Sequence, residues 1–523
     1  MPLRRTLLAL PALVTAPAAW ARASGAHPDA YPGGPFTLGV ASGDPWPDGV
    51  VLWTRLAPEP LAPLGGMPPE AAVEVGWEVA EDPGFTRIAA RGREVAHAGE
   101  GFSLHAEVTG LQPGRPYWYR FLADGVPSPV GRTRTAPAPD AAAPVRFIHA
   151  GCQHLEHGWF TAWRHVAEEA EIDFVFHYGD YIYETAGRSP GQPGGFGPAV
   201  RRHAGGTCRT LAEYRQRYAQ YQSDPDLAAA HAAHPFVASF DDHEVENNWA
   251  GLQSEADGGG SRPPVAVPEA AVLARRAAAF QAWWEAMPLR RAQRPRGAAI
   301  LAHRRLRFGR LLDLHVLDTR QYRDDQPCGD VNGPACEAVA RPAAQVLGPA
   351  QEAWLLGNLG PAGATWQVLA QQVMLMPRRL ARGGISMDKW DGYPAARARL
   401  LAGLAARRVA NPVILSGDVH TAWAGDIRAG EDGPPVASEF TATSTTSSGD
   451  GSEALPGTAA TLARNPHVRF FNDRRGYCLH AAGPGRLETT FRAVAAVTRP
   501  GAAREDRGRF LLEAGRPGLQ PLG

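Results

Sequence analysis

The chain has 523 residues, 44% of them hydrophobic, and its 53 lysine and arginine residues balance its 53 aspartate and glutamate residues. This length exceeds one typical domain, so two folded units with sizeable cores are expected. The balanced charge argues against a chain that binds nucleic acid or an anionic membrane through its bulk charge, and no specific nucleic-acid partner is expected. Lys389 is the only lysine, so arginine supplies the rest of the positive charge.

The first 23 residues, MPLRRTLLALPALVTAPAAWARA, have the organisation of a signal peptide. A basic start precedes an apolar segment, and the small residues at 19–23 fit a signal-peptidase site. The apolar part contains two prolines and is too short for a comfortable membrane span, and no later segment reads as transmembrane. Arg4 and Arg5 favour export by the twin-arginine machinery, with an ordinary secretion signal as the alternative. We therefore expect a periplasmic or secreted protein.

The five cysteines fit an exported protein with few disulfides. Cys328 and Cys336 lie close together in the loop-like stretch QPCGDVNGPAC and are placed to close a small ring. For Cys208 and Cys478 the sequence leaves open whether they pair or remain free thiols. Cys152 is the odd one left over, and its position favours a metal ligand.

Residues 27–137 have the pattern of an all-β domain. The stretches FTLGVASGDPWPDGVVLWTRL, VEVGWEVA and SLHAEVTGLQPGRPYWYRFLADG alternate apolar and polar residues between turns. The segment Leu111–Tyr119 resembles a corner of fibronectin-type sandwiches, and a sandwich of about 100 residues fits this length. We therefore predict a small fibronectin- or immunoglobulin-like sandwich, followed by a proline-alanine linker at 135–144.

Residues 145–515 have the pattern of an α/β domain. Val145–Ala150 and Ile172–Tyr178 are apolar runs without helical period, and a helix-length segment separates them, which predicts a βαβ unit. The carboxyl ends of parallel strands lie side by side, and open α/β sheets bind ligands there. Further strands are predicted at Pro235–Phe240, Leu311–Leu317, 365–377 and Pro412–Leu415, a helix at Glu269–Met287, and added antiparallel strands after residue 430.

Metal-binding side chains follow four of these strands. They are Cys152 and His154, then Asp180 and Tyr183, then Asp241, Asp242, His243, Asn247 and Asn248, and finally Asp418 and His420. A single Asp-x-His or Cys-x-His is more often structural than a ligand set. Because all four groups lie just past an apolar strand of one domain, a structural origin requires several coincidences. The sequence therefore predicts a metal centre at the strand ends.

The ligand types indicate which metals fit. Thiolate, phenolate, carboxylate and imidazole together suit iron better than zinc, and the phenolate of Tyr183 favours ferric iron. The oxygen donors of Asp242, Asn247 and Asn248 suit Ca²⁺, Mg²⁺ or Mn²⁺. A mixed centre bridged by Asp180 would hold a phosphate and activate a water or hydroxide for in-line attack on phosphorus. His243 is placed to protonate the leaving alkoxide.

The order of these groups resembles the metallophosphoesterase superfamily. Its motifs D-x-H, G-D-x-x, G-N-H-[ED] and G-H-x-H appear here as CQH at 152–154, GDYIY at 179–183, DDHE at 241–244 and GDVH at 417–420. The departures from those motifs, together with DHEVENNWAG, LDTRQYRDDQPCGD and WDGYP, resemble the PhoD-like alkaline phosphatase D family. The resemblance covers essentially the whole chain after the signal. It implies a sheet-and-helix sandwich of the metallophosphoesterase type, preceded by the small all-β domain.

The same resemblance implies an exported hydrolase of phosphomonoesters and phosphodiesters with Fe³⁺ and Ca²⁺ as cofactors and phosphate-ester small molecules as substrates. Mn²⁺, Mg²⁺ and Zn²⁺ remain open for the second metal. By position, the implied iron ligands are Cys152, Asp180, Tyr183, Asp418 and His420. The implied calcium ligands are Asn247 or Asn248 together with Asp242, and the sequence does not choose between the two asparagines. His154 is expected to line the cleft or to contact a metal-binding side chain rather than to bind metal itself.

Beyond the metal ligands, the expected catalytic residues are His243, Asp242 and Arg475. Arg474 and Arg475 either offer a guanidinium group to phosphate or form a surface pair. Arg320, in the segment Asp318-Thr-Arg320, is expected to make a structural ion pair. We expect a monomer.

Three rival functions remain. A dedicated phosphodiesterase or phospholipase-type enzyme would use the same ligands, so only a substrate panel separates it from a phosphatase. A cell-surface binding protein would require an inert metal centre. A purple-acid-phosphatase-like enzyme is disfavoured by Cys152 and Asp418.

Overall fold

The computed structural model describes residues 34–188, 199–257, 265–361, 363–430 and 433–522. The predicted signal at 1–23 lies outside the described residues. Within those ranges, every helix is too short or too polar to cross a membrane.

The strands form three sheets. The large sheet has the order β22 (Arg516–Pro521), β21 (Arg504–Glu513), β20 (Arg486–Val494), β19 (Gly476–Ala482), β9 (Val145–Ala150), β10 (Phe174–His177), β11 (Pro235–Ala238), β1 (Val40–Trp46), β2 (Gly49–Arg55), β5 (Ser103–Thr109). The second sheet has the order β12 (Arg304–Phe308), β13 (Leu312–Val316), β14 (Trp366–Val373), β15 (Pro412–Gly417), β17 (Pro435–Thr441), β16 (Ala422–Arg428), β18 (Val468–Asn472). The third has the order β4 (Ile88–His97), β3 (Ala72–Ala80), β6 (Pro116–Ala123), β7 (Val126–Pro127), with β8 (Gly131–Arg134) also on β6.

Seven α-helices belong to the described residues. They are α1 (Thr161–Ala167), α2 (Leu211–Gln222), α3 (Pro225–Ala233), α4 (Glu269–Ala286), α5 (Gly348–Asn358), α6 (Pro394–Ala406) and α7 (Thr458–Arg464). Helix α2 begins at a capping box, in which the Glu213 carboxylate accepts from the Thr210 backbone N–H at 2.8 Å and the Thr210 hydroxyl accepts from the Glu213 N–H at 3.4 Å. At the start of α3 the Asp224 carboxylate accepts from the backbone N–H groups of Asp226 and Leu227, ahead of Pro225 at the first helical position.

The predicted βαβ unit is confirmed. Strands β9, β10 and β11 run parallel, with Phe174 opposite Phe147 and Val175 opposite both Ile148 and Phe236. In the second sheet β13, β14, β15 and β17 also run parallel. The predicted strands from β9 to β15 are all present, with ends that differ by a few residues. Antiparallel strands after residue 430 complete both sheets.

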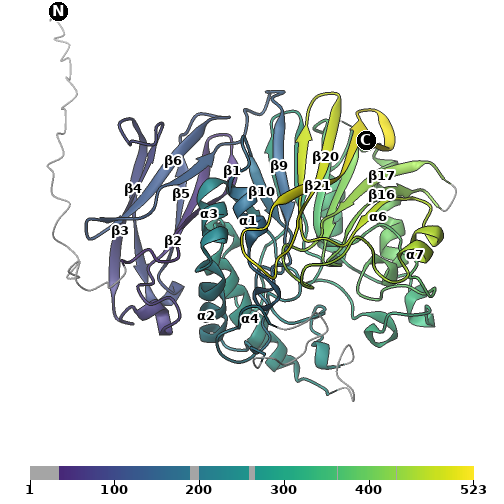
Figure 1. The fold of residues 1–523 in the computed structure, drawn as a ribbon, viewed down its shortest axis with the longest axis horizontal. Helices are drawn as coiled ribbons and strands as arrows, with labels where there is room; N and C mark the ends of the chain where they lie inside the picture. The colour runs from purple at the N-terminus through teal and green to yellow at the C-terminus, as the bar shows by residue number, and fades with distance from the viewer. Residues whose placement is uncertain (1–33, 189–198, 258–264, 362, 431–432, 523) are drawn as a thin grey trace, which may run out of the picture.

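The two larger sheets lie face to face, and helices cover both outer faces. One apolar layer joins Phe147 and Phe174 of the large sheet to Leu314, Val368 and Val413 of the second sheet. Residues of α1 to α4 pack on the other face of the large sheet. Residues of α5 and α6 pack on the outer face of the second sheet. Figure 1 shows this order from α1–α4 across the strands to α6. The parallel strand ends of both sheets therefore converge on one side of the molecule.

The described part of the predicted N-terminal domain, residues 34–137, is joined to the α/β part through a shared sheet. Its strands form two layers around a shared apolar core, β1, β2 and β5 on one side and the third sheet on the other. However, β1 also pairs with β11, with Ser42 opposite Pro235, so one layer continues the large sheet. Gly43 permits this contact, because a Cβ there would lie 2.5 Å from the Phe236 carbonyl oxygen. The predicted corner is present, since the Gln112 N–H donates to the Tyr117 hydroxyl at 2.9 Å.

Candidate metal centre

The chain turns sharply at the ends of β9, β10 and β15, where the predicted ligands begin. Cys152, Asp180 and Asp418 have φ angles of 51°, 53° and 67°. His420 and Asn248 have φ angles of 58° and 50°. Residues other than glycine adopt this left-handed conformation rarely and at a cost of about 1–2 kcal/mol each. The turns thus hold several residues of one cleft in an unfavourable backbone conformation, which is typical of functional sites.

Glycines let these turns approach one another. A Cβ on Gly179 would lie 2.4 Å from the backbone nitrogen of Asp241. A Cβ on Gly417 would lie 2.2 Å from the ring of Tyr178. The glycines of the GD motifs at 179–180 and 417–418 therefore bring the ends of β10, β11 and β15 into contact.

The first cluster joins Cys152, Asp180, Tyr183 and His420. The Cys152 thiol donates to Asp180 Oδ2 at 3.2 Å, and the Tyr183 hydroxyl donates to the same oxygen at 2.8 Å. The Tyr183 oxygen also lies 3.2 Å from Nε2 of His420. Ser447 Oγ lies 2.6 Å from the Tyr183 hydroxyl and orients it. Thiol, phenol, imidazole and carboxylate, predicted from three strand ends, thus meet at one point.

A second group of acids adjoins the first. Ligand atoms of Asp180, Asp242 and His243 lie within 4.8 Å of one another, and so do those of Asp241, Asp242 and Asp418. Asp180 therefore belongs both to the first cluster and to the cluster with Asp242 and His243. Asp242 in turn is shared with the cluster that contains Asp241 and Asp418. This arrangement fits adjacent cations that share a carboxylate.

Buried oxygens in these clusters fit a cation. Asp180 Oδ1, Asp241 Oδ2 and Asp242 Oδ1 have no hydrogen-bond partner among the described residues. Burial raises the pKa of Asp180, and the neighbouring carboxylate of Asp242 raises it further. Burial also raises the pKa of Asp241, although Arg320 opposes this effect. Unpartnered buried carboxylates are costly unless a positive charge compensates them, so the donor set fits bound metal.

The softer groups show the same requirement. Burial, followed by the charge of Asp180, raises the pKa of both the Cys152 thiol and the Tyr183 phenol. Without added positive charge both groups keep their protons. A bound metal ion is what converts such groups to thiolate and phenolate.

His243 is held by a carboxylate that the sequence analysis did not select. Its Nδ1 lies 2.7 Å from Oε2 of Glu184, and its ring lies 4.1 Å from that of Tyr183. Burial alone lowers the pKa of His243, but Glu184 and Asp242 outweigh it and raise the pKa well above its usual value. Glu184 and Asp242 therefore favour the protonated form of the imidazole. Glu184 directly follows the predicted ligand Tyr183 in the sequence, and this position could have identified Glu184 as a site residue.

Arg320 is the main counter-charge of the acids. Its guanidinium group is wholly buried, with Nε 2.5 Å from Asp241 and Nη1 2.7 Å from Asp388. Nη2 lies 3.5 Å from Asp418 and 3.7 Å from Asp242. The expected ion pair is present, but its partners come from other elements and include Asp241, Asp242 and Asp418 of the predicted metal-binding groups.

Lys389 also faces the centre. Its Nζ lies 2.8 Å from Asp388 and contacts Asp418 directly. Arg323 pairs with Asp388 at 2.8 Å. Sequence reasoning missed Asp388 and Lys389 as site residues, although they immediately precede the WDGYP motif.

A polar hollow of about 230 Å³ opens beside these charges, and Asn248, Asp330 and Lys389 line it. The Asn248 side chain donates to Asp330, and its N–H donates to Asp242 at 2.8 Å. Asn247 instead donates to Glu255 at 2.7 Å. Of the two asparagines, Asn248 is therefore the one that faces the hollow.

Arg475 has a different position from the one expected for a phosphate-binding residue. Its side chain is wholly buried, and it donates to the carbonyl oxygens of His420 and Ser447 and to Asp473. These contacts use the guanidinium group to hold the turns that carry His420 and Ser447. Arg474 lies at the surface side and pairs with Glu453 at 3.2 Å.

His154 lies against Tyr183 outside the cation clusters. Its ring stacks on His157 with centroids 3.8 Å apart and lies 4.3 Å from the Tyr183 ring. His203 stacks at 5.0 Å. Burial lowers the pKa of His154, and the neighbouring His157 lowers it further. The position agrees with a residue that contacts a ligand, and it shows a histidine stack that the sequence did not indicate.

The predicted ring between Cys328 and Cys336 is confirmed as a disulfide. All cysteines lie in the described part of the chain, and there Cys152, Cys208 and Cys478 are free and buried. The ring carries Asp330, so it places that carboxylate at the polar hollow.

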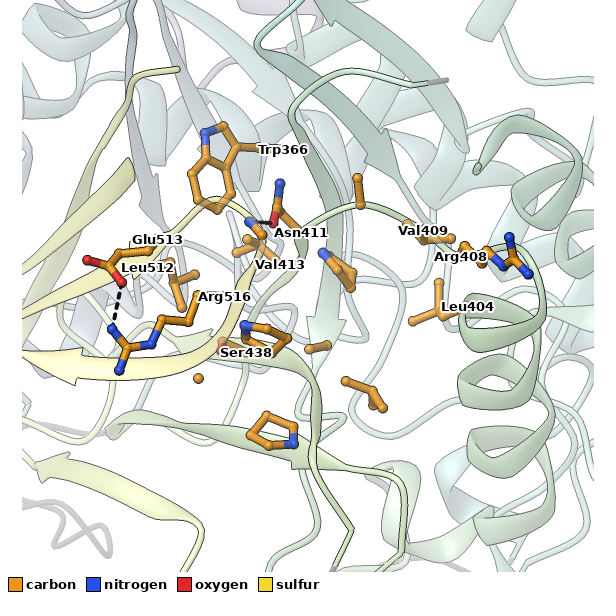
Figure 2. Close-up of a pocket in the computed structure, with 18 of the residues that line it drawn as sticks. Trp366, Leu404, Arg408, Val409, Asn411, Val413, Ser438, Leu512, Glu513 and Arg516 are labelled. Carbon is orange, nitrogen blue, oxygen red and sulfur yellow. Dashed lines mark hydrogen bonds and ion pairs between the residues drawn. The ribbon is translucent and has the colours of Figure 1, made fainter. Parts of the chain in front are cut away.

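An apolar hollow of about 350 Å³ lies at the opposite ends of β14 and β15. Figure 2 shows Trp366, Leu404, Val413 and Leu512 around it. Trp366 begins β14 and Val413 lies near the start of β15, whereas Asp418 follows the end of β15. This hollow therefore belongs to a different part of the molecule from the metal-binding groups.

Face-to-face mixed sheets covered by helices, with acids and soft ligands at the strand ends, define a metallophosphoesterase-like protein. The family model for the PhoD-like phosphatase matches residues 147–491, and that for the PhoD-like phosphatase, N-terminal domain, matches residues 20–137. The chain is 44% identical over 495 residues to alkaline phosphatase D of Bacillus subtilis (strain 168), covering 93% of this chain and 82% of that protein. The chain belongs to the PhoD-like phosphatase family and is a phosphohydrolase.

Solved structures agree. The structure of PhoD superposes with a TM-score of 0.88 and 43% identity, covering 94% of this chain and 92% of that one. A purple acid phosphatase from yellow lupin (Lupinus luteus) superposes with a TM-score of 0.53 and 11% identity, covering 91% of this chain and 73% of that one. The second likeness concerns the fold alone. Such relatives imply metal cofactors, and the clusters described above are groups that fit them.

Proposed function

We propose that this chain is an exported, metal-dependent phosphatase that hydrolyses phosphomonoesters and phosphodiesters at a centre of Fe³⁺ and Ca²⁺. The observation that carries the proposal is the set of unpartnered buried oxygens on Asp180, Asp241 and Asp242 beside a thiol and a phenol. The domain division at 27–137 and 145–515 and the signal at 1–23 belong to the same proposal.

The proposed iron ligands are Cys152, Asp180, Tyr183, Asp418 and His420. Thiolate and phenolate favour a ferric ion at this point. Asp242 and Asn248 are the proposed calcium ligands, because hard oxygen donors suit calcium and Asn248 faces the hollow. Membership in two clusters supports Asp180 as the shared ligand.

When bound, the cations supply Lewis-acid charge to the phosphate group and lower the pKa of a nearby water. The side chains of the protein hold the proposed metal ligands in position and supply a proton to the leaving group. His243, held cationic by Glu184 at 2.7 Å, carries a proton for the departing alkoxide. Arg320 and Lys389 hold Asp418 from two sides. Arg475 positions His420 and Ser447 through their carbonyl groups.

The first test measures phosphate release at alkaline pH from an aryl phosphate monoester and from the corresponding diester, before and after prolonged chelation. Loss of both activities after chelation and their return with iron and calcium are expected. Activity that survives chelation would count against the metal mechanism. The ratio of the two rates decides between a general phosphatase and a dedicated phosphodiesterase.

A variant tests the shared ligand. Asp180→Asn is expected to lose bound iron and about 10³-fold in kcat/KM, because a metal contributes several kcal/mol of charge stabilisation. Asp426→Asn is a matched control, since Asp426 is buried on β16 and pairs with Arg469 outside the centre. An Asp180→Asn protein that retains iron and full turnover would exclude the bridging role.

Export is tested by cell fractionation of the full chain. Replacing Arg4 and Arg5 with lysine is expected to leave precursor in the cytoplasm. Normal export of that variant would show that an ordinary secretion signal suffices.

A further inference from the structure

Three buried side chains outside the proposed centre meet between the two large sheets. His149 lies on β9, and Cys478 and His480 lie on β19, where Cys478 is opposite His149. All three side chains have an exposed fraction of 0%. Their ligand atoms lie within 4.8 Å of one another. Since alternate residues of a strand point to the same face, the group projects into the apolar layer between the sheets.

Aromatic rings enclose the two imidazoles. His480 stacks on Phe147 with centroids 4.6 Å apart, and Phe440 meets it edge-on at 5.5 Å. His149 stacks on Phe176 at 5.8 Å. A phenylalanine at either position would make similar ring contacts without burying a polar atom. Packing alone therefore does not account for two histidines here.

Several ring nitrogens in this layer lack partners. Both nitrogens of His149 and Nε2 of His480 have no hydrogen bond of normal geometry to any described residue. Such burial is unfavourable unless another interaction compensates it. Burial lowers the pKa of His149 to about 3, so its ring is neutral and keeps a free lone pair.

A neighbouring hydroxyl group orients the His480 ring, as is common in metal sites. Nδ1 of His480 lies 2.9 Å from the Thr489 hydroxyl oxygen, which leaves Nε2 free. A histidine that ligates a metal commonly donates its other N–H to such an oxygen.

We propose that His149, Cys478 and His480 form a second, structural metal site for one soft, thiol-binding cation, Cu⁺ or Zn²⁺. Thiolate and imidazole select these ions over calcium and magnesium. Three such ligands around one ion lie roughly 3.5–4 Å apart, so small side-chain movements complete the site. Binding releases the Cys478 proton to solvent as the chain folds around the ion.

Charge balance distinguishes the two cations. One thiolate and two neutral imidazoles carry a charge of −1, so Cu⁺ gives a neutral site and Zn²⁺ leaves one positive charge. An uncompensated charge is unfavourable in an apolar layer, which favours Cu⁺. The site lies on β19 and on β9, the strand that precedes Cys152, yet it shares no ligand with the phosphatase centre. The inference therefore does not depend on the proposed function.

The test uses the full chain purified from cells supplied with copper and zinc. After dialysis against a chelator, metal is counted per protein in the parent and in Cys478→Ala, Cys478→Ser and His480→Phe. The parent is expected to retain about one equivalent of copper or zinc, and each variant about none. X-ray absorption at the retained metal should show one sulfur and two nitrogen ligands.

Matched controls separate ligation from burial. His315 is also buried with two unpartnered ring nitrogens, but it is not part of any cluster of potential ligands in the described chain. His315→Phe should retain the ion, and so should Cys208→Ala, which removes another buried free thiol. Asp180→Asn should also retain it, which separates this site from the phosphatase centre.

Two results would overturn the proposal. One is a parent protein that holds no copper or zinc after chelation. The other is retention of the ion in the Cys478 variants. Circular dichroism confirms folding of each variant, and Cys478→Ser, which keeps side-chain size, answers the question if His480→Phe does not fold.

Discussion

The two ends of the parallel strands β13 to β15 differ in chemistry. Past their carboxyl ends lie Arg320 and Asp418, buried and paired with groups from other elements. At their amino ends Trp366 and Val413 border an apolar hollow. Along these strands, the charged site groups therefore lie at the carboxyl ends and the apolar groups lie at the amino ends. Changes at the charged end should alter catalysis and metal content, whereas changes at the apolar end should alter stability alone.

The largest effect is expected at the charged end, for Asp418→Asn. Loss of one carboxylate removes a proposed iron ligand, and kcat/KM should fall about 10³-fold. Because the change relieves repulsion among the acids but also removes the attraction to Arg320 and Lys389, the two effects oppose each other and the Tm should stay near that of the parent. Enzyme kinetics, iron analysis and calorimetry check these outcomes together. Unaltered iron content would contradict a ligand role for Asp418.

Arg320→Met should lower both activity and stability, since it leaves Asp241 buried without its ion-pair partner and removes one of three cations from Asp388. Removing one partner of a buried ion pair destabilises a protein by about 3–5 kcal/mol. Denaturant unfolding measures the loss. As a control, Arg87→Met removes the partner of Glu81 in a solvent-exposed pair and should cost much less. Equal losses in both variants would break the proposed contrast.

A further experiment measures how the stability of the protein depends on pH. Glu439 of β17 is buried and accepts from Ser416 and the backbone of Leu375, and burial raises its pKa to about 7. A carboxyl group whose pKa is raised in the folded state stabilises that state while protonated. Stability should therefore decline as the pH rises from about 4.5 through 7.

Glu439→Gln should flatten that decline, because a neutral amide occupies the site at every pH. Thermal unfolding of the parent and the variant between pH 5 and 8 checks the prediction. Parallel curves for the two proteins would show that another group controls the pH dependence.

The smallest effect is expected beside the apolar hollow, for Asn411→Ala. Asn411 accepts from the Gly515 N–H and donates to the Thr365 carbonyl group, each at 2.7 Å. Loss of both contacts should cost about 1–2 kcal/mol without change in kcat/KM. Figure 2 shows Asn411 beside the apolar hollow, near Trp366 and Val413. If the fully folded Asn411→Ala protein had reduced turnover, the apolar end would also contribute to catalysis, which would contradict this contrast.

The sequence predicted the parallel core because its strands are short apolar runs that end in small or polar residues. It also predicted that Cys152, Asp180, Tyr183 and His420 meet, since parallel strands present their carboxyl ends at one edge. These inferences need only local pattern and chain direction.

Long-range partners were not predictable in this way. The pairing of β1 with β11 joins segments far apart in the chain and depends on register. In the sequence, Arg320 and Arg475 cannot be distinguished from surface arginines, because burial is a property of the packed fold. Asn247 and Asn248 are adjacent on one turn, and only the backbone conformation at Asn248 decides which side chain faces the hollow.

Lys389, the only lysine, has a further consequence. Its ε-amine is held between two aspartates with 12% of the side chain exposed. Reagents that acylate amines therefore find no other side-chain target on this molecule. The rate at which they modify the chain away from its N-terminal amine would report how often the cleft opens, without any engineered label.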